Sequence, residues 1–261
     1  MSAPNPYAAP KAPVADQASP RPGNFTPGGR TRPAGNGWSW IAEGWRFFLR
    51  APGTWIAIVV VMLLISFAAN FVPFVGPIAM MVLTPVFAGG LMLGCRALDE
   101  GGELEFRHLF AGFQAPLGSL AALGALYLAL VFAVMVVVGV ITGASLFAMF
   151  GGSGVQDPAM VGGALATLAL GMLVGLALMV PVAMLLWFAP ALVALDRVAP
   201  LDALKGSWSG CMKNVVPFLI YGVVLFVFAI VASLPLMLGW LALGPVMAAS
   251  IYTSYRDIYL G

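Results

Sequence analysis

Long apolar runs alternate with short amphipathic stretches along this chain. The apolar runs predict six membrane-spanning helices, because a helix that crosses a bilayer needs about 20 predominantly apolar residues. We expect these spans at about residues 54–72, 77–98, 117–150, 159–195, 215–234 and 236–254. The third and fourth runs are longer than one crossing requires, which indicates tilt or extension beyond the bilayer.

A shorter stretch with a helical period of about 3.6 residues precedes each pair of spans. The first, residues 38–50, has an apolar face made of Trp38, Ile41, Trp45, Phe48 and Leu49. The second, residues 103–114, has an apolar face made of Phe106, Leu109, Phe110 and Phe113. The third, residues 201–212, has one made of Leu201, Leu204, Trp208, Cys211 and Met212. This pattern predicts interfacial helices lying at the membrane surface.

A Pro-Val pair recurs within the second span of each predicted pair. It occurs at Pro85, Pro181 and Pro245, and the first and third copies align at a constant offset through Arg96 and Arg256. Repetition at this scale indicates a fold assembled from copies of one unit. We therefore expect an all-α membrane protein with six transmembrane helices in three helix–span–span units, related by a parallel rather than an inverted repeat. The three prolines either kink their helices or free a backbone carbonyl for a ligand.

Residues 1–37 are rich in Pro, Gly and Ala and lack apolar periodicity. Such a segment buries too little apolar surface to offset its ordering entropy, so a disordered cytoplasmic tail is expected there. Residues 38–261 would then form the six-span transmembrane domain.

Composition strengthens the membrane interpretation. The chain is 61% hydrophobic and only 8% charged, whereas soluble domains carry roughly a quarter charged residues. With six spans drawn, all 12 Lys and Arg fall on the side of the N-terminus, and Asp157 is the one acidic residue on the other side. Positive charges flanking spans mark the cytoplasmic side, so both termini are expected in the cytoplasm.

Several chemistries lack their usual residues. The predicted spans contain no carboxylate of the kind that couples transport to protons or sodium. The chain has two cysteines, Cys95 and Cys211, and one histidine, too few for a zinc cage. There is no Ser/His/Asp set and no phosphate-cradling glycine loop. We therefore expect neither an enzyme nor a cofactor or metal site.

The candidate contacts to anions or lipid headgroups are cations on the predicted cytoplasmic side. They are Arg96, Arg256, Arg197 and Lys205. An arginine guanidinium binds phosphate through a planar fork of donors. The alternative is that these side chains serve as anchors that reach the interface and fix orientation.

Five segments together resemble an uncharacterised family of proteobacterial integral membrane proteins known mainly by a Burkholderia locus name. These segments are Leu83-Thr84-Pro85-Val86, Gly89-Gly90-Leu91-Met92, His108-Leu109-Phe110-Ala111-Gly112-Phe113, Trp187-Phe188-Ala189-Pro190-Ala191-Leu192 and Ser254-Tyr255-Arg256-Asp257-Ile258. The resemblance covers about residues 38–259 and implies a bacterial inner-membrane location, but it brings no activity or site residues. A looser resemblance links Ala189–Leu192 and Ala203–Ser207 to six-span domains found beside glycerophosphodiester phosphodiesterases.

The leading hypothesis is a non-enzymatic inner-membrane protein that engages lipid headgroups or membrane partners at its cytoplasmic face. A channel or exporter for a small solute and a scaffold subunit of a membrane complex remain as alternatives. The expected partners are membrane lipids and a membrane protein, and no nucleic acid.

Overall fold

The computed structural model describes residues 25–114, 116–151 and 158–261. Over these residues the chain is helical, with turns and no strand. The elements are α1 Asn36–Arg50, α2 Pro52–Ala69, α3 Val75–Asp99, the 3₁₀ helix η1 Phe106–Phe113, α4 Leu117–Gly151, α5 Pro158–Leu186, α6 Ala189–Asp196, α7 Pro200–Lys213, α8 Val215–Ser233, α9 Trp240–Tyr255 and the π-helix η2 Arg256–Leu260. Most of the expected tail and the turn that contains Asp157 lie outside the described residues.

Five segments of the described chain are long and apolar enough to cross a membrane. They are Pro52–Ala69, Val75–Asp99, Leu117–Gly143, Val161–Asp196 and Val215–Ser233. The expected sixth span, residues 236–254, is instead the 16-residue helix α9, about 24 Å long at 1.5 Å per residue. It begins late because Leu236 and Met237 have φ angles of 51° and 64°, which place the preceding turn in the left-handed region.

The expected fourth span is divided into α5 and α6. Helix α5 continues through Pro181, then the chain leaves helical geometry at Trp187 and Phe188. Pro190 in the first turn of α6 donates no backbone hydrogen bond, which favours a new helix start there. The buried hydroxyl of Ser207 donates to the Met184 carbonyl (2.7 Å) and accepts from the Phe188 N–H (2.9 Å). Helix α7 thus satisfies the backbone groups that the break leaves free.

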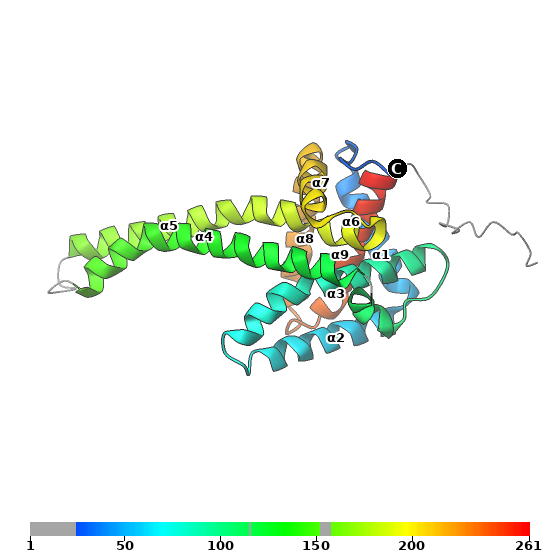
Figure 1. Ribbon diagram of the computed structural model, residues 1–261, viewed down its shortest axis with the longest axis horizontal. Helices are drawn as coiled ribbons and strands as arrows, with labels where there is room; N and C mark the ends of the chain where they lie inside the picture. The colour runs from blue at the N-terminus through cyan, green and yellow to red at the C-terminus, as the bar shows by residue number, and fades with distance from the viewer. Residues whose placement is uncertain (1–24, 115, 152–157) are drawn as a thin grey trace, which may run out of the picture.

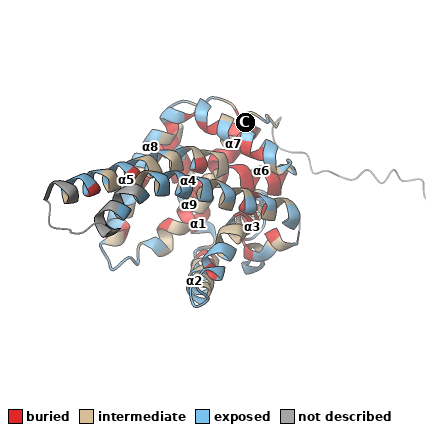
Figure 2. Ribbon diagram, turned by 60° about the vertical axis from the view of Figure 1, so that its left-hand side comes forward, coloured by how far each residue is buried: buried red, intermediate tan, exposed pale blue. Residues whose placement is uncertain are grey.

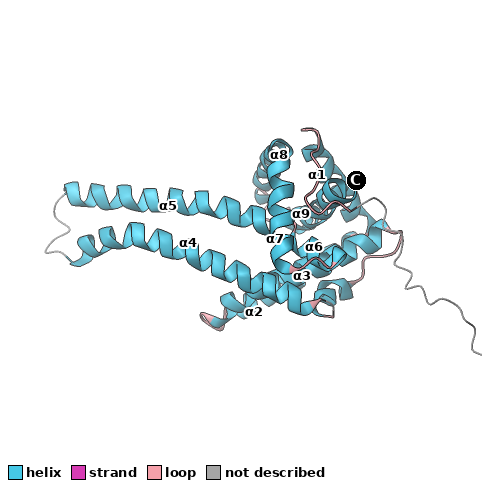
Figure 3. Ribbon diagram, turned by 45° about the horizontal axis from the view of Figure 1, so that its top comes forward, coloured by secondary structure: helices cyan, strands magenta, loops and turns pink. Residues whose placement is uncertain are grey.

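The molecule consists of a packed helical core from which helix pairs extend. The pair α4–α5 extends furthest from the core, and α2 and the first half of α3 form a second projection (Figure 1, Figure 3). Buried residues gather in the later half of α3, in α6 and α9, and in the short helices α1, η1 and α7 (Figure 2). The outer faces of α2, α4, α5 and α8 expose Leu, Val, Phe and Met instead. Such surfaces require lipid or protein to cover them.

Each of the three short helices packs on a long helix from another hairpin or on its extension. Helix α1 packs on α9 and α8, η1 packs on α3, and α7 packs on α5 and α6. The closest approaches occur at glycines: a Cβ atom added at Gly44 would lie 2.7 Å from the Val246 carbonyl oxygen, and one added at Gly112 would lie 2.0 Å from that of Val86. Two of the three Pro-Val pairs therefore lie where a short helix contacts the backbone of a long one.

The buried face of α1 coincides only in part with its predicted apolar face. In α1 the buried residues are Gly37, Trp40, Ile41, Gly44, Phe47 and Phe48. Trp38, Trp45 and Leu49, which were assigned to the apolar face, are about half exposed. Small residues permit close packing between helices. Gly37 lies against α8 and Gly44 against α9, so the face that contains these glycines is buried and Trp38, Trp45 and Leu49 remain on the outer surface.

Order extends further towards the N-terminus than the sequence predicts. Residues 25–35 lie against α7 and the C-terminal end. The Thr26 N–H donates a hydrogen bond to the Tyr259 carbonyl and the Arg30 N–H donates one to the Ile258 carbonyl, each at 2.9 Å. The fully buried Asn214 accepts from Arg32 N–H (2.7 Å) and donates to the Arg30 carbonyl (2.9 Å). The expected disordered segment 1–37 thus overlaps an ordered strap from residue 25 onward.

Candidate functional site

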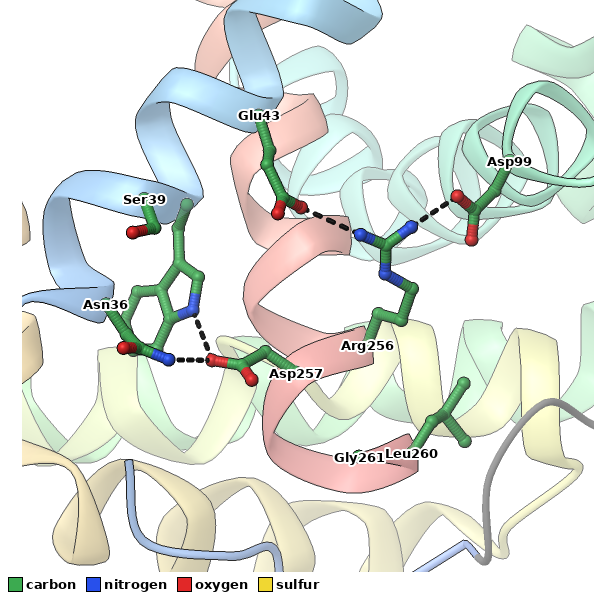
Figure 4. A pocket seen from close by; sticks show the side chains of 9 residues that line it. Asn36, Ser39, Glu43, Asp99, Arg256, Asp257, Leu260 and Gly261 are labelled. Carbon is green, nitrogen blue, oxygen red and sulfur yellow. Dashed lines mark hydrogen bonds and ion pairs between the residues drawn. The ribbon is translucent and has the colours of Figure 1, made fainter. Parts of the chain in front are cut away.

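Arg256 forms the centre of an ion-pair cluster at the end of α9. Its Nη2 lies 2.8 Å from Glu43 Oε2 of α1, and its Nη1 pairs with Asp99 Oδ1 of α3 (Figure 4). The Tyr252 hydroxyl donates to the other Asp99 oxygen at 3.1 Å. One guanidinium therefore joins three helices, and a phosphate that approached Arg256 would compete with two carboxylates already in place.

Asp257 is held by the first turn of α1 and by the N-terminal strap. It accepts from Asn36 Nδ2 (2.7 Å) and Trp40 Nε1 (2.9 Å), and its other oxygen lies 3.1 Å from Arg32 Nε. Together with Arg256 and its two carboxylate partners, Asp257 lines an open polar cavity of about 750 Å³. The described lining thus includes three carboxylates and one guanidinium, which makes this cavity a poor receptor for an anion.

The other predicted headgroup contacts lie elsewhere on the surface. Arg96 Nε is 3.9 Å from Glu100 Oε1, and Lys205 Nζ is 3.4 Å from Asp202 Oδ1, both pairs largely exposed. Arg197 is exposed and takes a left-handed conformation (φ 57°) at the C-terminal end of α6. None of these three cations lines the Arg256 cavity, so the structure does not bring the four predicted residues together in that cavity. Weak exposed pairs leave Arg96 and Lys205 open to other anions.

The three prolines singled out in the sequence lie inside helices that continue past them. Pro85 lies in α3, Pro181 in α5 and Pro245 in α9. The carbonyl oxygens of the residues that follow Pro85 and Pro245 face the glycines of η1 and α1. The geometry therefore explains Pro85 and Pro245 as positions where two helices pack closely.

An apolar groove of about 670 Å³ lies between α1 and the α8–α9 hairpin. Its walls come from Ile41, Ala42, Val231, Ala232, Leu243 and Val246, among others. Trp38, Trp45 and Arg46 also line it, on the α1 side. The Trp38 ring is held by an edge contact to Phe228, with ring centroids 6.3 Å apart. An apolar groove with a cation and tryptophans along one side has the composition expected of a phospholipid site.

Arg46 is the one strongly basic residue in the lining of this groove. Its side chain is exposed, and no ion pair or hydrogen bond joins it to another described side chain. A phosphate would therefore meet no internal competitor there, in contrast to Arg256. Arg46 lies outside the apolar face that the sequence predicts for residues 38–50, and it was not among the predicted headgroup contacts. The sequence feature that points to Arg46 is its position directly after Trp45 on a predicted interfacial helix.

The comparisons with known proteins agree with a membrane location. The chain is similar to a probable inner membrane protein of Burkholderia thailandensis, at 29% identity over 245 residues, which cover 87% of this chain and 91% of that protein. This similarity confirms the expected resemblance to Burkholderia membrane proteins. No protein-family model and no solved structure matches the chain. Together with the five apolar helices, the similarity supports a multi-pass protein of the inner membrane.

Proposed function

We propose that this protein is a non-enzymatic lipid-binding protein of the inner membrane, and that it holds an anionic phospholipid in the groove between α1 and the α8–α9 hairpin. The observation that carries the proposal is the exposed, unpaired guanidinium of Arg46 in the lining of an apolar groove of about 670 Å³. Acyl chains would occupy the apolar part, and the phosphate would bind Arg46.

The groove suits this ligand in both size and chemistry. Small-molecule pockets measure about 300–1,000 Å³ and combine a largely apolar lining with few polar groups. Trp38 and Trp45 are amphipathic rings of the kind that gather at headgroup level. A basic side chain near an anionic membrane surface contributes about 1 kcal/mol. The exposed cations Arg96, Arg197 and Lys205 would add a less specific attraction, whereas Arg256 would hold the helices together.

The proposal is tested by native mass spectrometry of the protein in mild detergent with phosphatidylglycerol or phosphatidylethanolamine added. The wild type should bind phosphatidylglycerol about fivefold more tightly, the equivalent of about 1 kcal/mol. Arg46→Gln should remove this preference. Arg107→Gln is the matched control, because Arg107 pairs with Glu105 at 2.6 Å and does not line the groove.

An unchanged preference in Arg46→Gln would overturn the assignment of the groove. A lipid-free protein that retains a stoichiometric protein partner would favour the scaffold alternative instead. Solute flux faster than that of empty liposomes would favour the channel.

We further infer a six-span topology in three helix–span–span units, with α9 as a short sixth span and both termini in the cytoplasm. The packing supports this arrangement, since each short helix contacts the second long helix of another proposed unit: α1 with α9, η1 with α3, and α7 with α5–α6. The equivalent glycine contacts at the carbonyls of Val86 and Val246 support the same register in two units. In this topology the short helices α1, η1 and α7 would all lie on the cytoplasmic side.

A further inference from the structure

A second cavity, of about 440 Å³, lies where α3, α4, α5, α6 and α9 meet. It is separate from the groove that contains Arg46, and the two share no lining residue. Among its thirteen lining residues, Thr84, Tyr127 and Trp187 are the three that carry a polar side-chain atom. Pro85, Val182 and Ile251 bring all three proposed units to this one cavity.

The polar atoms of this lining differ in whether they have a partner. The Thr84 hydroxyl donates to the Met80 carbonyl at 2.7 Å, so it is satisfied within its own helix. The Trp187 indole Nε1 is buried and has no hydrogen-bond acceptor among the described residues. No hydrogen bond joins the Tyr127 hydroxyl to another described residue either. Buried donors nearly always have partners in folded proteins, so an orphaned one requires an explanation.

The position of Trp187 is fixed by its neighbours. Its ring meets Phe218 and Tyr221 of α8 edge-on, with centroid distances of 5.7 and 5.8 Å. The Tyr221 hydroxyl is itself hydrogen-bonded to the Ser250 hydroxyl of α9, at 2.7 Å. Because these contacts hold the indole in place at the break between α5 and α6, turning outward to find an acceptor would disrupt packing with α8. None of the described residues supplies the missing acceptor, whereas a bound molecule would.

We propose that this cavity binds an acyl chain of a membrane lipid, with a carbonyl or carboxylate oxygen of that lipid accepting the hydrogen bond of Trp187. An apolar cavity of this kind does not hold water well, because water needs two to four polar partners. The cavity lies among helices of membrane length, where acyl chains are the surrounding solvent. A phospholipid ester and a free fatty acid share this chemistry, and the experiment distinguishes them.

The test uses two photoreactive probes in vesicles that contain the purified full-length protein. One is a fatty acid with a diazirine on its chain, and the other is phosphatidylglycerol that carries the same chain. After illumination, tandem mass spectrometry should locate adducts at cavity residues such as Met92, Met179 and Ile251. Adducts from the fatty acid alone would identify a single-chain ligand, and adducts from the phospholipid a membrane phospholipid. Both results support the proposal.

Two variants with matched controls make the test specific. Ala88→Leu fills the cavity and should lower cavity labelling at least about fivefold, whereas Ala133→Leu on the exposed face of α4 should not. Trp187→Phe keeps an aromatic ring but removes the donor, so half-maximal labelling should require about three- to tenfold more probe. Trp208→Phe, an exposed position outside the cavity, should leave labelling unchanged.

Labelling confined to the outer helix faces, or cavity labelling that persists in both Ala88→Leu and Trp187→Phe, would overturn the proposal. Size-exclusion profiles that match the wild type would establish that the variants are folded. Arg46→Gln should leave the cavity adducts intact, so failure of this proposal and failure of the phospholipid groove are distinguishable.

Discussion

Replacement of Asn214 by Ala should release the N-terminal strap, residues 25–35, from the core. Asn214 is fully buried at the end of α7. Its side chain bonds to the Arg32 N–H, the Arg30 carbonyl and the Gly210 carbonyl, at 2.7, 2.9 and 2.8 Å. Two of these bonds, to Arg32 and Arg30, join the strap, so at about 1 kcal/mol each the variant loses about 2 kcal/mol of strap attachment. The population of the open strap should then rise about 30-fold.

Limited trypsin digestion measures this opening at the Arg30–Thr31 bond, because cleavage of a transiently opened segment follows the population of the open form. Asn214→Ala should be cut about 30-fold faster there than the wild type. Asn70→Ala is the matched control, since Asn70 is a less buried residue that makes a single local bond to the Ser66 carbonyl at 2.7 Å. Equal cleavage rates at Arg30 in the wild type and in Asn214→Ala would refute the claim that Asn214 anchors the strap.

Three further predictions concern packing, titration and topology. Gly112→Ala should lower the melting temperature by several degrees, because the new Cβ would lie 2.0 Å from the Val86 carbonyl oxygen. The control Gly118→Ala adds a Cβ that meets no atom within 4 Å, so the melting temperature should stay unchanged. Burial raises the pKa of the Cys211 thiol to about 12, above the roughly 8.5 of a free thiol. This thiol should therefore resist maleimide at pH 8 in the folded protein. Because the thiol ionises more readily in the unfolded chain, its contribution to stability should fall as pH rises from about 9 to 12. Ser153→Cys should react with a membrane-impermeant maleimide from the periplasmic side of whole cells, and reaction from the cytoplasmic side alone would reverse the proposed topology.

Hydropathy predicts the long helices well because length and apolar content determine them. The beginnings of α2, α3, α4 and α8 fall within about two residues of the expected positions. The beginning of α9 was wrong by four residues, since the left-handed conformations of Leu236 and Met237 depend on how the turn packs. The single span expected over residues 159–195 did not include the break between α5 and α6. The part played by Ser207 follows from a contact with a different helix.

The candidate site was harder to predict from sequence. A hydropathy pattern groups Trp38 and Trp45 with Ile41 on one apolar face. It does not show that close packing through Gly44 buries only part of that face and leaves the two tryptophans on the outside. Arg256 looked like a free cation because its partner Glu43 lies 213 residues away in the sequence. Pairings of this kind depend on tertiary structure, and a single sequence without its fold does not contain them.

The central claim is that the groove beside α1 holds an anionic phospholipid through Arg46. The most direct test is a native mass spectrum of the protein released from its own membrane, recorded for the wild type and for Arg46→Gln. The account predicts one retained anionic phospholipid per chain in the wild type and its loss in the variant. A wild type without retained anionic lipid, or equal retention in both proteins, would contradict it.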